Sequence, residues 1–174
     1  VIENACRERG SRLTQLDDDF QYVHTPTLIS GADERWPLVQ VTTRRRAWPA
    51  YSLGLIGEHQ AQNAAIALAA VEELQAQGVA LGERNIESGL ANVRWPARLE
   101  VIARRPLVLL DCAHNVASAH ALVQSIEESF PLSPDARRLL IFAGRKDKDL
   151  AGMLGVLAPR FERIYLTSFQ TSQR

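Results

Sequence analysis

Residues 12–56 follow a two-residue hydrophobic pattern. Apolar and polar side chains alternate, or β-branched residues cluster, and turns rich in Pro, Gly, Asp and Ser separate these runs. The pattern predicts β-strands in the segments FQYVHT (20–25), PLVQVTT (37–43) and YSLGLIG (51–57). The preceding segment, VIENACRERG, is predicted to be helical up to Gly10.

A helical pattern follows these strands. Residues 57–78 are rich in Ala, Leu, Glu and Gln and end at Gly78, which predicts one long helix. A shorter helix is predicted for residues 83–92. The residues RWP then interrupt the pattern, and we place a boundary between two parts of the chain at Trp95–Pro96.

Strands and helices alternate beyond this boundary. Their predicted order is strand, strand, helix, strand, helix, strand, in residues 98–103, 106–111, 115–130, 137–144, 148–159 and 163–169. The first of these helices repeats its apolar residues at helical spacing, at Val116, Ala119, Leu122, Val123, Ile126 and Phe130. The alternation predicts an α/β fold with a mostly parallel sheet.

Composition argues against several classes of protein. The 20 basic and 20 acidic residues cancel, so no basic field indicates a nucleic-acid partner. No apolar run approaches the roughly 20 residues of a membrane span. Cys6 and Cys112 are too few for a disulfide framework or a metal cluster, and a reduced cytoplasm is the simplest location. Because the chain begins at Val1 and not at Met, we expect it to be part of a longer protein.

One cluster of charge stands out, at Arg44, Arg45 and Arg46. It could form a cationic patch for a ligand. We favour a solvated loop or an edge strand that its charges keep from aggregating.

The segment LLDCAHN (109–115) ends an apolar strand in polar residues. Ligands of open α/β sheets bind beyond the carboxyl ends of the strands, and Asp111 lies at such an end. Asn115 can cap the next helix, whose free N–H groups suit a phosphate. Capping and turn formation explain the same residues, so both interpretations stay open. We expect His114 to be a hydrogen-bonded turn residue, and Cys112 to be a small buried side chain rather than a nucleophile.

The two strands 98–103 and 106–111 are close enough in sequence to form a tight hairpin around Arg104 and Arg105. Arg98 would then lie across from Asp111 at the open end, give or take a residue or two. An arginine there could bind phosphate or pair with the aspartate.

Further polar candidates lie on the long helix and near residue 147. His59 and Asn63 are four residues apart on one face of an Ala-rich helix, and a buried Asn63 would suit the edge of a purine. A bond from Asn63 to a neighbouring loop is the interpretation we favour from the residues alone. In GRKDKD (144–149), Asp147 or Asp149 can cap a helix, and a place beside a nucleotide is the alternative. No P-loop pattern, complete acid/base pair or metal-ligand cluster occurs in the sequence.

Four segments occur in a fixed order: GEHQAQNAAIALAAVEEL, WPARLEVI, DCAHNVASAHAL and FAGRKDKDLAGML. Together they resemble folylpolyglutamate synthase, in bacteria often also dihydrofolate synthase, of the Mur ligase superfamily. The resemblance covers almost the whole chain. Its most specific part is WPARLE followed by DCAHN.

The resemblance implies a P-loop ATPase domain and a smaller, Rossmann-like C-terminal domain, with ATP in the cleft between them. Residues 1–94 would be the β-rich and helical end of the ATPase domain, and residues 95–174 an incomplete C-terminal α/β domain. The implied ligase phosphorylates a folate or dihydropteroate carboxylate with ATP and Mg²⁺, and L-glutamate then attacks the acyl phosphate. The magnesium ligands are expected outside this chain. A monomer is implied as well, and the charge balance and the lack of a long apolar run predict no nucleic-acid or membrane partner.

Particular residues match the family's motifs. By position, Asn63 matches the asparagine that contacts adenine, and Arg98 and Asp111 match nucleotide-binding residues. His114 matches the motif histidine, the one candidate catalytic residue, near the phosphates or glutamate.

The sequence also departs from the family at three positions. Ala97 and Cys112 stand where the family usually has Gly, and Val116 stands where it usually has Pro. A Cβ at Ala97 or Cys112 crowds the backbone if that position has a positive φ.

Two other functions stay open. One is a Mur-type ligase that adds an amino acid to a peptidoglycan precursor. The other is a non-catalytic α/β module that binds a nucleotide or a partner. In either ligase the P-loop would lie outside these residues, so we expect the 174-residue chain alone to bind nucleotide weakly and to form no amide bond.

Overall fold

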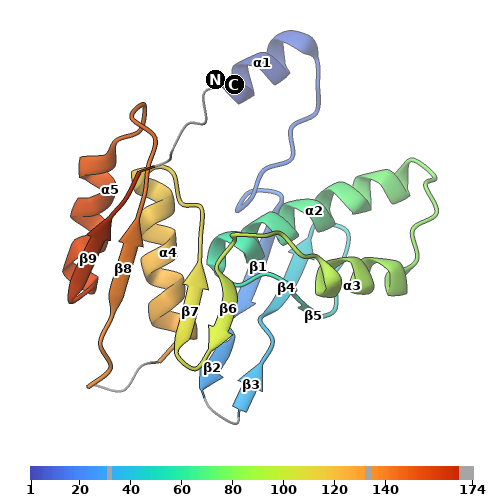
Figure 1. Ribbon diagram of the computed structural model, residues 1–174. Helices are drawn as coiled ribbons and strands as arrows, with labels where there is room; N and C mark the ends of the chain where they lie inside the picture. Colours follow the sequence, from blue (N-terminus) through green and yellow to red (C-terminus); the bar gives the residue numbers. More distant parts are fainter. Residues whose placement is uncertain (31–32, 132–134, 169–174) are drawn as a thin grey trace, which may run out of the picture.

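The computed structural model describes residues 1–30, 33–131 and 135–168. The first part of the chain contains, in order, α1 (Ile2–Arg9), β1 (Phe20–Thr25), β2 (Leu28–Ser30), β3 (Asp33–Arg35), β4 (Leu38–Thr43), β5 (Tyr51–Ser52), α2 (Glu58–Ala76) and α3 (Glu83–Asn92). The second contains β6 (Glu100–Arg104), β7 (Leu107–Leu110), α4 (Val116–Ser129), β8 (Leu139–Phe142), α5 (Leu150–Leu157), the 3₁₀ turn η1 (Ala158–Arg160) and β9 (Arg163–Leu166). Figure 1 gives their arrangement.

The first part is a small antiparallel sheet covered by α2. Its strand order is β1-β4-β5, and β2 and β3 form a separate hairpin. The inward residues of the sheet and the small residues of α2 bury a core around Val39, Val41, Trp48, Ala61 and Leu68. Gly10 takes the left-handed conformation that ends α1 (φ +62°), as its sequence predicted.

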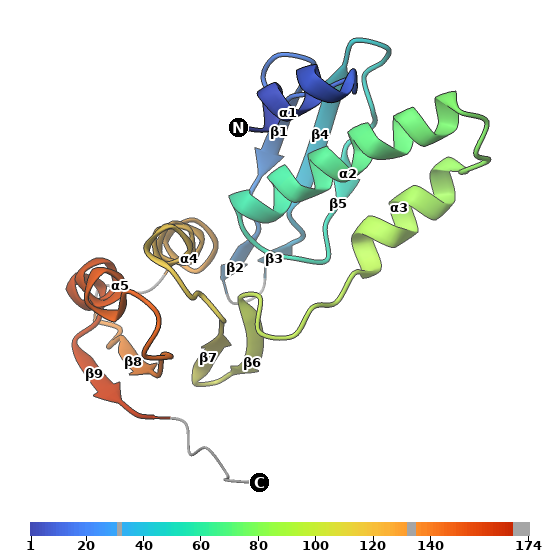
Figure 2. The same ribbon diagram turned by 90° about the horizontal axis from the view of Figure 1, so that it is seen from above.

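In the second part, α4 and α5 lie on the same side of β6, β7, β8 and β9, as Figure 2 shows from above. Strands β8 and β9 are parallel, whereas β6 and β7 form an antiparallel hairpin. Among the described residues these two pairs share no backbone ladder. A second core gathers around Ala119, Val123, Phe142, Met153 and Leu157.

The β6–β7 hairpin differs from the prediction in its turn. Glu100 pairs with Leu110 and Arg104 pairs with Leu107, so Arg105 and Pro106 form the turn in place of Arg104 and Arg105. The register also shifts between Val101 and Ala103. The shift lies within the range that a poor turn sequence allows, and the open end still joins residues 97–99 to residues 111–112. Phe169, at the end of the last predicted strand, lies outside the described residues.

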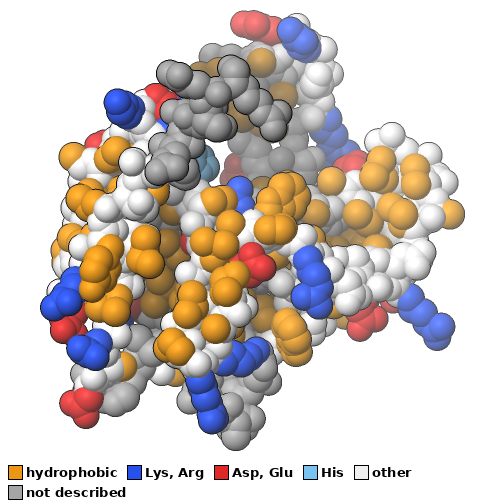
Figure 3. All heavy atoms as spheres, in the orientation of Figure 1, with side chains coloured by type: hydrophobic (Ala, Val, Ile, Leu, Met, Phe, Trp, Pro, Cys, Tyr) orange, Lys and Arg blue, Asp and Glu red, His pale blue; other side chains and the backbone are white. Residues whose placement is uncertain are grey.

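The second part leaves one face of its strands uncovered in the described residues. Figure 3 shows hydrophobic side chains gathered over β6–β7 and β8–β9. The exposed apolar residues of these strands are Ile102, Val108, Leu110, Leu139, Ile141, Tyr165 and Leu166. Leu140 and Phe142 on the other face of β8 pack with residues of α4 and α5, so β8 is apolar on both sides, as is typical of sheets covered by two layers of helices.

Two buried clusters therefore lie on either side of Trp95–Pro96, and helix α4 contacts both α2 and β2. This arrangement supports our proposal of a domain boundary at that point. The contact between α2 and α4 is close. A Cβ at Gly57, the residue before α2, would lie 2.5 Å from Ser125 Oγ of α4.

Candidate nucleotide site

The carboxylate of Asp111 holds two turns together at the open end of the β6–β7 hairpin. Its Oδ2 accepts the backbone N–H of Leu99 at 2.8 Å, and its Oδ1 accepts that of Ala113 at 2.7 Å. Cys112 N–H donates to Ala97 O at 2.9 Å across the same end. Asp111 therefore stabilises the turn in the absence of any ligand. This structural role does not prevent the carboxylate from contacting a ligand as well.

This tie fixes the conformation of the residues around Arg98. Ala97 and Leu99 have positive φ, at +57° and +47°, and the Leu99 side chain is 2% exposed. Buried Leu99 anchors the turn, and the guanidinium of half-buried Arg98 forms no hydrogen bond or ion pair with any residue that the structure describes. As the hairpin predicted, Arg98 and Asp111 lie at the same edge, although no ion pair between them is seen within the described part of the chain.

Ala97 and Cys112, which stand where the family usually has Gly, differ in backbone conformation. Ala97 lies in the left-handed region, where a Cβ costs roughly 1–2 kcal/mol, so the strain anticipated for this position is present. Cys112 has no positive φ. The prediction that Cys112 is buried is wrong, because its thiol is exposed at the mouth of the turn.

Asn115 caps α4 as predicted. Its side chain accepts from Ser118 N–H at 2.7 Å, and Ser118 Oγ accepts from the Asn115 backbone at 3.1 Å, which completes a capping box. His114 is exposed, and its Nδ1 lies 3.3 Å from Cys112 O. Both agree with the turn-and-cap interpretation of this segment, and no ligand role of His114 follows from these contacts.

His59, on the first turn of α2, is half-buried. Burial lowers the pKa of His59 below its ordinary 6.5; the Asp111 carboxylate acts against this shift and the Arg98 charge adds to it. Two charges of the second part of the chain therefore act on an imidazole of the first part. The sequence alone placed His59 only on the same helix face as Asn63.

A second polar group underlies the start of α2. Glu58 accepts a 2.6 Å hydrogen bond from Tyr22 OH, and its other oxygen lies 2.6 Å from Nδ1 of His24. The His24 side chain is 3% exposed, and its Nε2 has no partner among the described residues. Burial, followed by the bond to Glu58, raises the pKa of Tyr22 to about 12. This group ties β1 to α2 and supports the position of His59.

Asn63 lies one turn beyond His59. The expectation that Asn63 is buried is wrong, because its side chain is exposed, and among the described residues its Nδ2 donates only to Gln60 Oε1, at 3.4 Å. The Ala-rich helix buries another face, through Ala61, Ala64, Ala65 and Leu68. The amide of Asn63 is therefore open to a ligand, and the favoured bond to a neighbouring loop is absent from the described residues.

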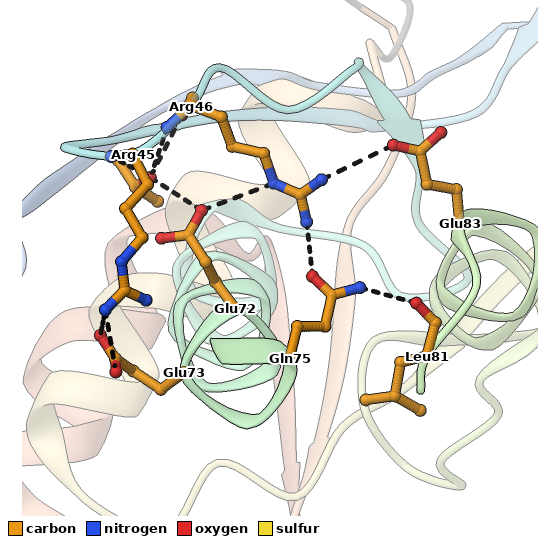
Figure 4. Close-up of polar contacts among 8 residues, drawn as sticks. Arg45, Arg46, Glu72, Glu73, Gln75, Leu81 and Glu83 are labelled. Carbon is orange, nitrogen blue, oxygen red and sulfur yellow. Dashed lines mark hydrogen bonds and ion pairs between the residues drawn. The ribbon is translucent and has the colours of Figure 1, made fainter. Parts of the chain in front are cut away.

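Arg44 and Arg45 are exposed in the loop after β4, in agreement with the favoured interpretation of a solvated loop, and all three arginines also form ion pairs. Arg46 contacts Glu72 and Glu83 and donates to Gln75 Oε1 at 2.7 Å (Figure 4). Its guanidinium carbon also lies 3.3 Å from the ring centre of Trp48. The neighbouring arginines form their own pairs, Arg44 with Asp19 and Arg45 with Glu73. The network joins the β4–β5 connection to α2 and α3, and it is structural.

The segment 144–149 also divides into separate roles. Asp149 caps α5, accepting from Gly152 N–H at 2.8 Å, whereas Asp147 pairs with Arg145 at 3.0 Å. Within residues 1–30, 33–131 and 135–168, no group of three or more His, Cys, Asp or Glu side chains could hold a metal ion. No helix in the described part of the chain is both long enough and apolar enough to cross a membrane.

Comparison with known proteins adds a family and a set of relatives. Residues 97–174 match the family described as "Mur ligase, glutamate ligase domain". The chain is 32% identical over 154 residues to dihydrofolate synthase/folylpolyglutamate synthase of Bacillus subtilis, covering 86% of this chain and 35% of that protein. It is 40% identical over 118 residues to the protein of the same name from Mycobacterium tuberculosis, covering 66% of this chain and 23% of that protein.

Solved structures give the same picture. A Mycobacterium tuberculosis folylpolyglutamate synthase complexed with ADP and AMPPCP superimposes with a TM-score of 0.80 at 31% identity, over 97% of this chain and 36% of that one. An FPGS–AMPPCP–folate complex also gives a TM-score of 0.80, at 27% identity, over 97% of this chain and 39% of that one. The chain thus spans between about a quarter and a third of the length of these two curated relatives.

Proposed function

Since this chain belongs to the Mur ligase family, with residues 97–174 as its glutamate ligase domain, we propose that it acts as part of an ATP-dependent ligase that adds L-glutamate to a folate. The observation that carries the proposal is Arg98, which has no hydrogen-bond or ion-pair partner among the described residues and lies on a turn that the Asp111 carboxylate holds. A half-buried guanidinium without a counter-ion is suited to an anionic ligand, because its rigid fork of donors matches phosphate geometry.

Each proposed site residue has a role that its surroundings support. Arg98 donates to phosphate or ribose oxygens of ATP. Asp111 fixes the turn through Leu99 and Ala113 and has lone pairs left for a ribose hydroxyl. Asn63, exposed on α2, offers a donor and an acceptor to the purine edge. His114, exposed at the entrance to α4, is proposed to act near the phosphates or the incoming glutamate.

The chemistry is proposed to follow the ligase pattern. ATP phosphorylates the substrate carboxylate, and the amine of L-glutamate displaces phosphate to give an amide, ADP and phosphate. Catalysis of phosphoryl transfer depends on positioning and on neutralising charge. Arg98, Asp111 and Asn63 would supply positioning of the nucleotide from this side. Magnesium would neutralise phosphate charge, with ligands outside the described residues, which do not form a metal site.

The relatives support this substrate class. Two carry the name dihydrofolate synthase/folylpolyglutamate synthase, and one solved relative is a complex with AMPPCP and folate. We propose that the substrates of this protein are ATP, a folate or dihydropteroate, and L-glutamate. We also propose that the protein is a monomer. A cytoplasmic location is proposed too, and the free thiols of Cys6 and Cys112 suit a reducing compartment.

The test is a ligase assay on the polypeptide encoded by the complete reading frame. ADP release would be followed with ATP, Mg²⁺ and L-glutamate, offering tetrahydrofolate, dihydropteroate and a peptidoglycan precursor in parallel. We expect turnover with one or both pterin substrates, and none from the 174-residue chain by itself because its sequence has no P-loop.

Other outcomes would overturn the proposal. Turnover with the peptidoglycan precursor alone would indicate the other ligase class. ATP binding without turnover on any substrate would indicate a non-catalytic nucleotide-binding module. Amide formation by the 174-residue chain would contradict the proposal that the ligase reaction needs a P-loop outside these residues.

A further inference from the structure

Helix α2 is apolar on two opposite sides. Figure 2 shows β1 and β4 along one of these sides. The residues of α2 that are buried there are Ala61, Ala64, Ala65 and Leu68. Four residues of the opposite side lie in one line at helical spacing, Ile66, Ala67, Ala70 and Leu74. We call these four residues the α2 stripe.

The α2 stripe is exposed among the described residues. Ile66 is 50% exposed and Leu74 is 43% exposed, and the two alanines are exposed as well. No Asp, Glu, Lys or Arg occurs in the sequence between Glu58 and Glu72. A helix side that faces water normally carries charged and polar residues, and a helix that is apolar all round is typical of the interior of a larger protein. The pattern of α2 therefore predicts a second layer of protein over the stripe.

Helix α4 of the same molecule shows the pattern of a helix that does face water. Its exposed residues at helical spacing are Ala117, His120, Gln124 and Glu127, and three of these four are polar or charged. Both helices bury one side and expose the other among the described residues. Only α4 has an exposed side whose composition suits water.

The size of the α2 stripe indicates what kind of partner covers it. From Ile66 to Leu74 the stripe is about 12 Å long, at a rise of roughly 1.5 Å per residue. A stable complex between separate proteins buries roughly 800 Å² on each partner, which is more than four partly exposed side chains can supply. A segment of the same polypeptide avoids most of the entropic cost of association, so a small apolar surface is enough to hold it.

The comparisons and the place of Asn63 point to one such segment. This chain spans 35% of the Bacillus subtilis relative and 36% of the solved Mycobacterium tuberculosis structure with ADP and AMPPCP. The P-loop of the proposed ligase would lie outside these residues, and Asn63, the proposed adenine contact, lies one helical turn before Ala67 in line with the stripe. A P-loop binds the phosphates of the nucleotide. One ATP molecule can reach both Asn63 and the P-loop only if the P-loop part lies against this side of α2.

We propose that the α2 stripe is the docking surface for the part of the same polypeptide that carries the P-loop, so that α2 lies between that part and strands β1 and β4. The identity of this occupant rests on the proposed function. The docking surface accounts for the apolar residues on the exposed side of α2, which neither the fold of the described residues nor the nucleotide contacts require.

The first experiment measures access to the stripe in the polypeptide of the complete reading frame, purified alone. Ile66→Cys and Ala70→Cys place thiols on the stripe, and Gln124→Cys places a control thiol on the exposed side of α4. Iodoacetamide labelling is followed by mass spectrometry on the tryptic peptide of each site, so other cysteines do not interfere. We expect both stripe thiols to react about tenfold or more slowly than the α4 thiol, because they react only after local opening.

The two stripe variants differ in how much they disturb packing. Ala70→Cys adds a single heavy atom, so it keeps the test open if Ile66→Cys does not fold. Equal labelling rates for the stripe thiols and the α4 thiol would overturn the proposal.

The second experiment identifies the occupant in the same complete polypeptide. Photo-leucine, incorporated in place of leucine, forms covalent links on illumination to groups in direct contact with it. We expect links from position 74 to peptides of the P-loop part. Leu122, packed against the second core, is the control and should link within that core. Links from position 74 to a second copy, recognised in a mixture of isotopically light and heavy protein, would overturn the proposal, as would links to the described residues alone.

Neither experiment uses ATP or a folate, so the docking surface and the proposed function can fail separately. Protected stripe thiols in a polypeptide without ligase turnover would contradict the ligase activity and keep the docking surface. Ligase turnover in a polypeptide whose stripe thiols label as fast as the α4 thiol would keep the activity and overturn the docking surface.

Discussion

Arg46 and Arg98 are both half-buried arginines, and they differ in what surrounds the guanidinium. Arg46 meets Glu72, Glu83 and Gln75 and lies over the ring of Trp48. Arg98 meets no partner in the described part of the chain, although its backbone is fixed by Asp111 through Leu99. The guanidinium of Arg46 has partners within the protein. The backbone of Arg98 is fixed, but its guanidinium has no partner among the described residues.

The difference separates structural charge from ligand-binding charge. A partly buried cation without a partner loses hydration and gains nothing from the protein, so such a position makes physical sense where a ligand supplies the anion. The three arginines in a row at residues 44–46 raised a cationic patch as one possibility, although a solvated loop or edge strand was the favoured interpretation there. The surroundings of each side chain, rather than the density of charge in the sequence, identify the site.

The largest effect is expected from removing the tie at Asp111. Asp111→Ala leaves the N–H groups of Leu99 and Ala113 without their acceptor, and two hydrogen bonds to a charged group are worth about 3 kcal/mol together. We expect urea unfolding of the 174-residue chain to report a loss of that size. Asp147→Ala, at an exposed carboxylate, is the control and should leave stability unchanged. An equal result for the two variants would mean that Asp111 does not hold the turn.

A smaller loss is expected from the paired arginine. Arg46→Ala removes two ion pairs, one hydrogen bond and a cation–π contact, and it leaves the 9% exposed Glu72 without its cation. After allowing for solvent screening of partly exposed pairs, we expect a loss of about 2 kcal/mol in unfolding free energy. Arg44→Ala, whose side chain is 70% exposed, should cost much less. An equal loss of stability in Arg46→Ala and Arg44→Ala would contradict the structural role assigned to Arg46.

The smallest effect has the opposite sign. Ala97→Gly removes the strain of the positive φ beside Arg98. We expect the free energy of unfolding to rise by about 1 kcal/mol, less a few tenths because glycine gives the unfolded chain more freedom. Ala70→Gly, in the exposed middle of α2, is the matched control and should lose about 1 kcal/mol. Destabilisation by both substitutions would show that the turn at Ala97 is not strained.

A pH dependence of stability follows from His59. Its pKa in the folded chain lies below the ordinary 6.5, so the unfolded chain binds a proton at that site more readily. The contribution of His59 to stability is thus complete above pH 6.5 and is lost as the pH falls through the folded-state pKa. His59→Gln should reduce the loss of stability between pH 7 and pH 5, as measured by urea unfolding in buffers across this range.

The sequence was most informative where the signal is local. The helix at Glu83–Asn92 has the predicted limits, α2 differs from its prediction by a residue or two at each end, and Asn115 and Asp149 cap helices as their positions suggest. Such elements depend on propensity and capping, which neighbouring residues decide.

The sequence was less informative where distant segments meet. The hairpin turn moved by one residue because Arg-Arg carries no strong turn signal. Asn63 was considered as a buried residue because it interrupts an otherwise apolar, Ala-rich surface, but α2 packs against β1 and β4 through another face. The packing of α2 on α4, where Gly57 approaches Ser125, joins segments far apart in the chain, and the local sequence around neither residue encodes that contact.

The most direct measurement compares the two arginines in one pair of assays. Arg98→Gln and Arg46→Gln would be made in the polypeptide of the complete reading frame, and ATP affinity and unfolding free energy would be measured for both. We predict that Arg98→Gln weakens ATP binding by about tenfold or more at unchanged stability, and that Arg46→Gln lowers stability at unchanged affinity. Parent-like ATP affinity in Arg98→Gln, or a loss of stability there that matches Arg46→Gln, would contradict the assignment of Arg98 to the nucleotide site.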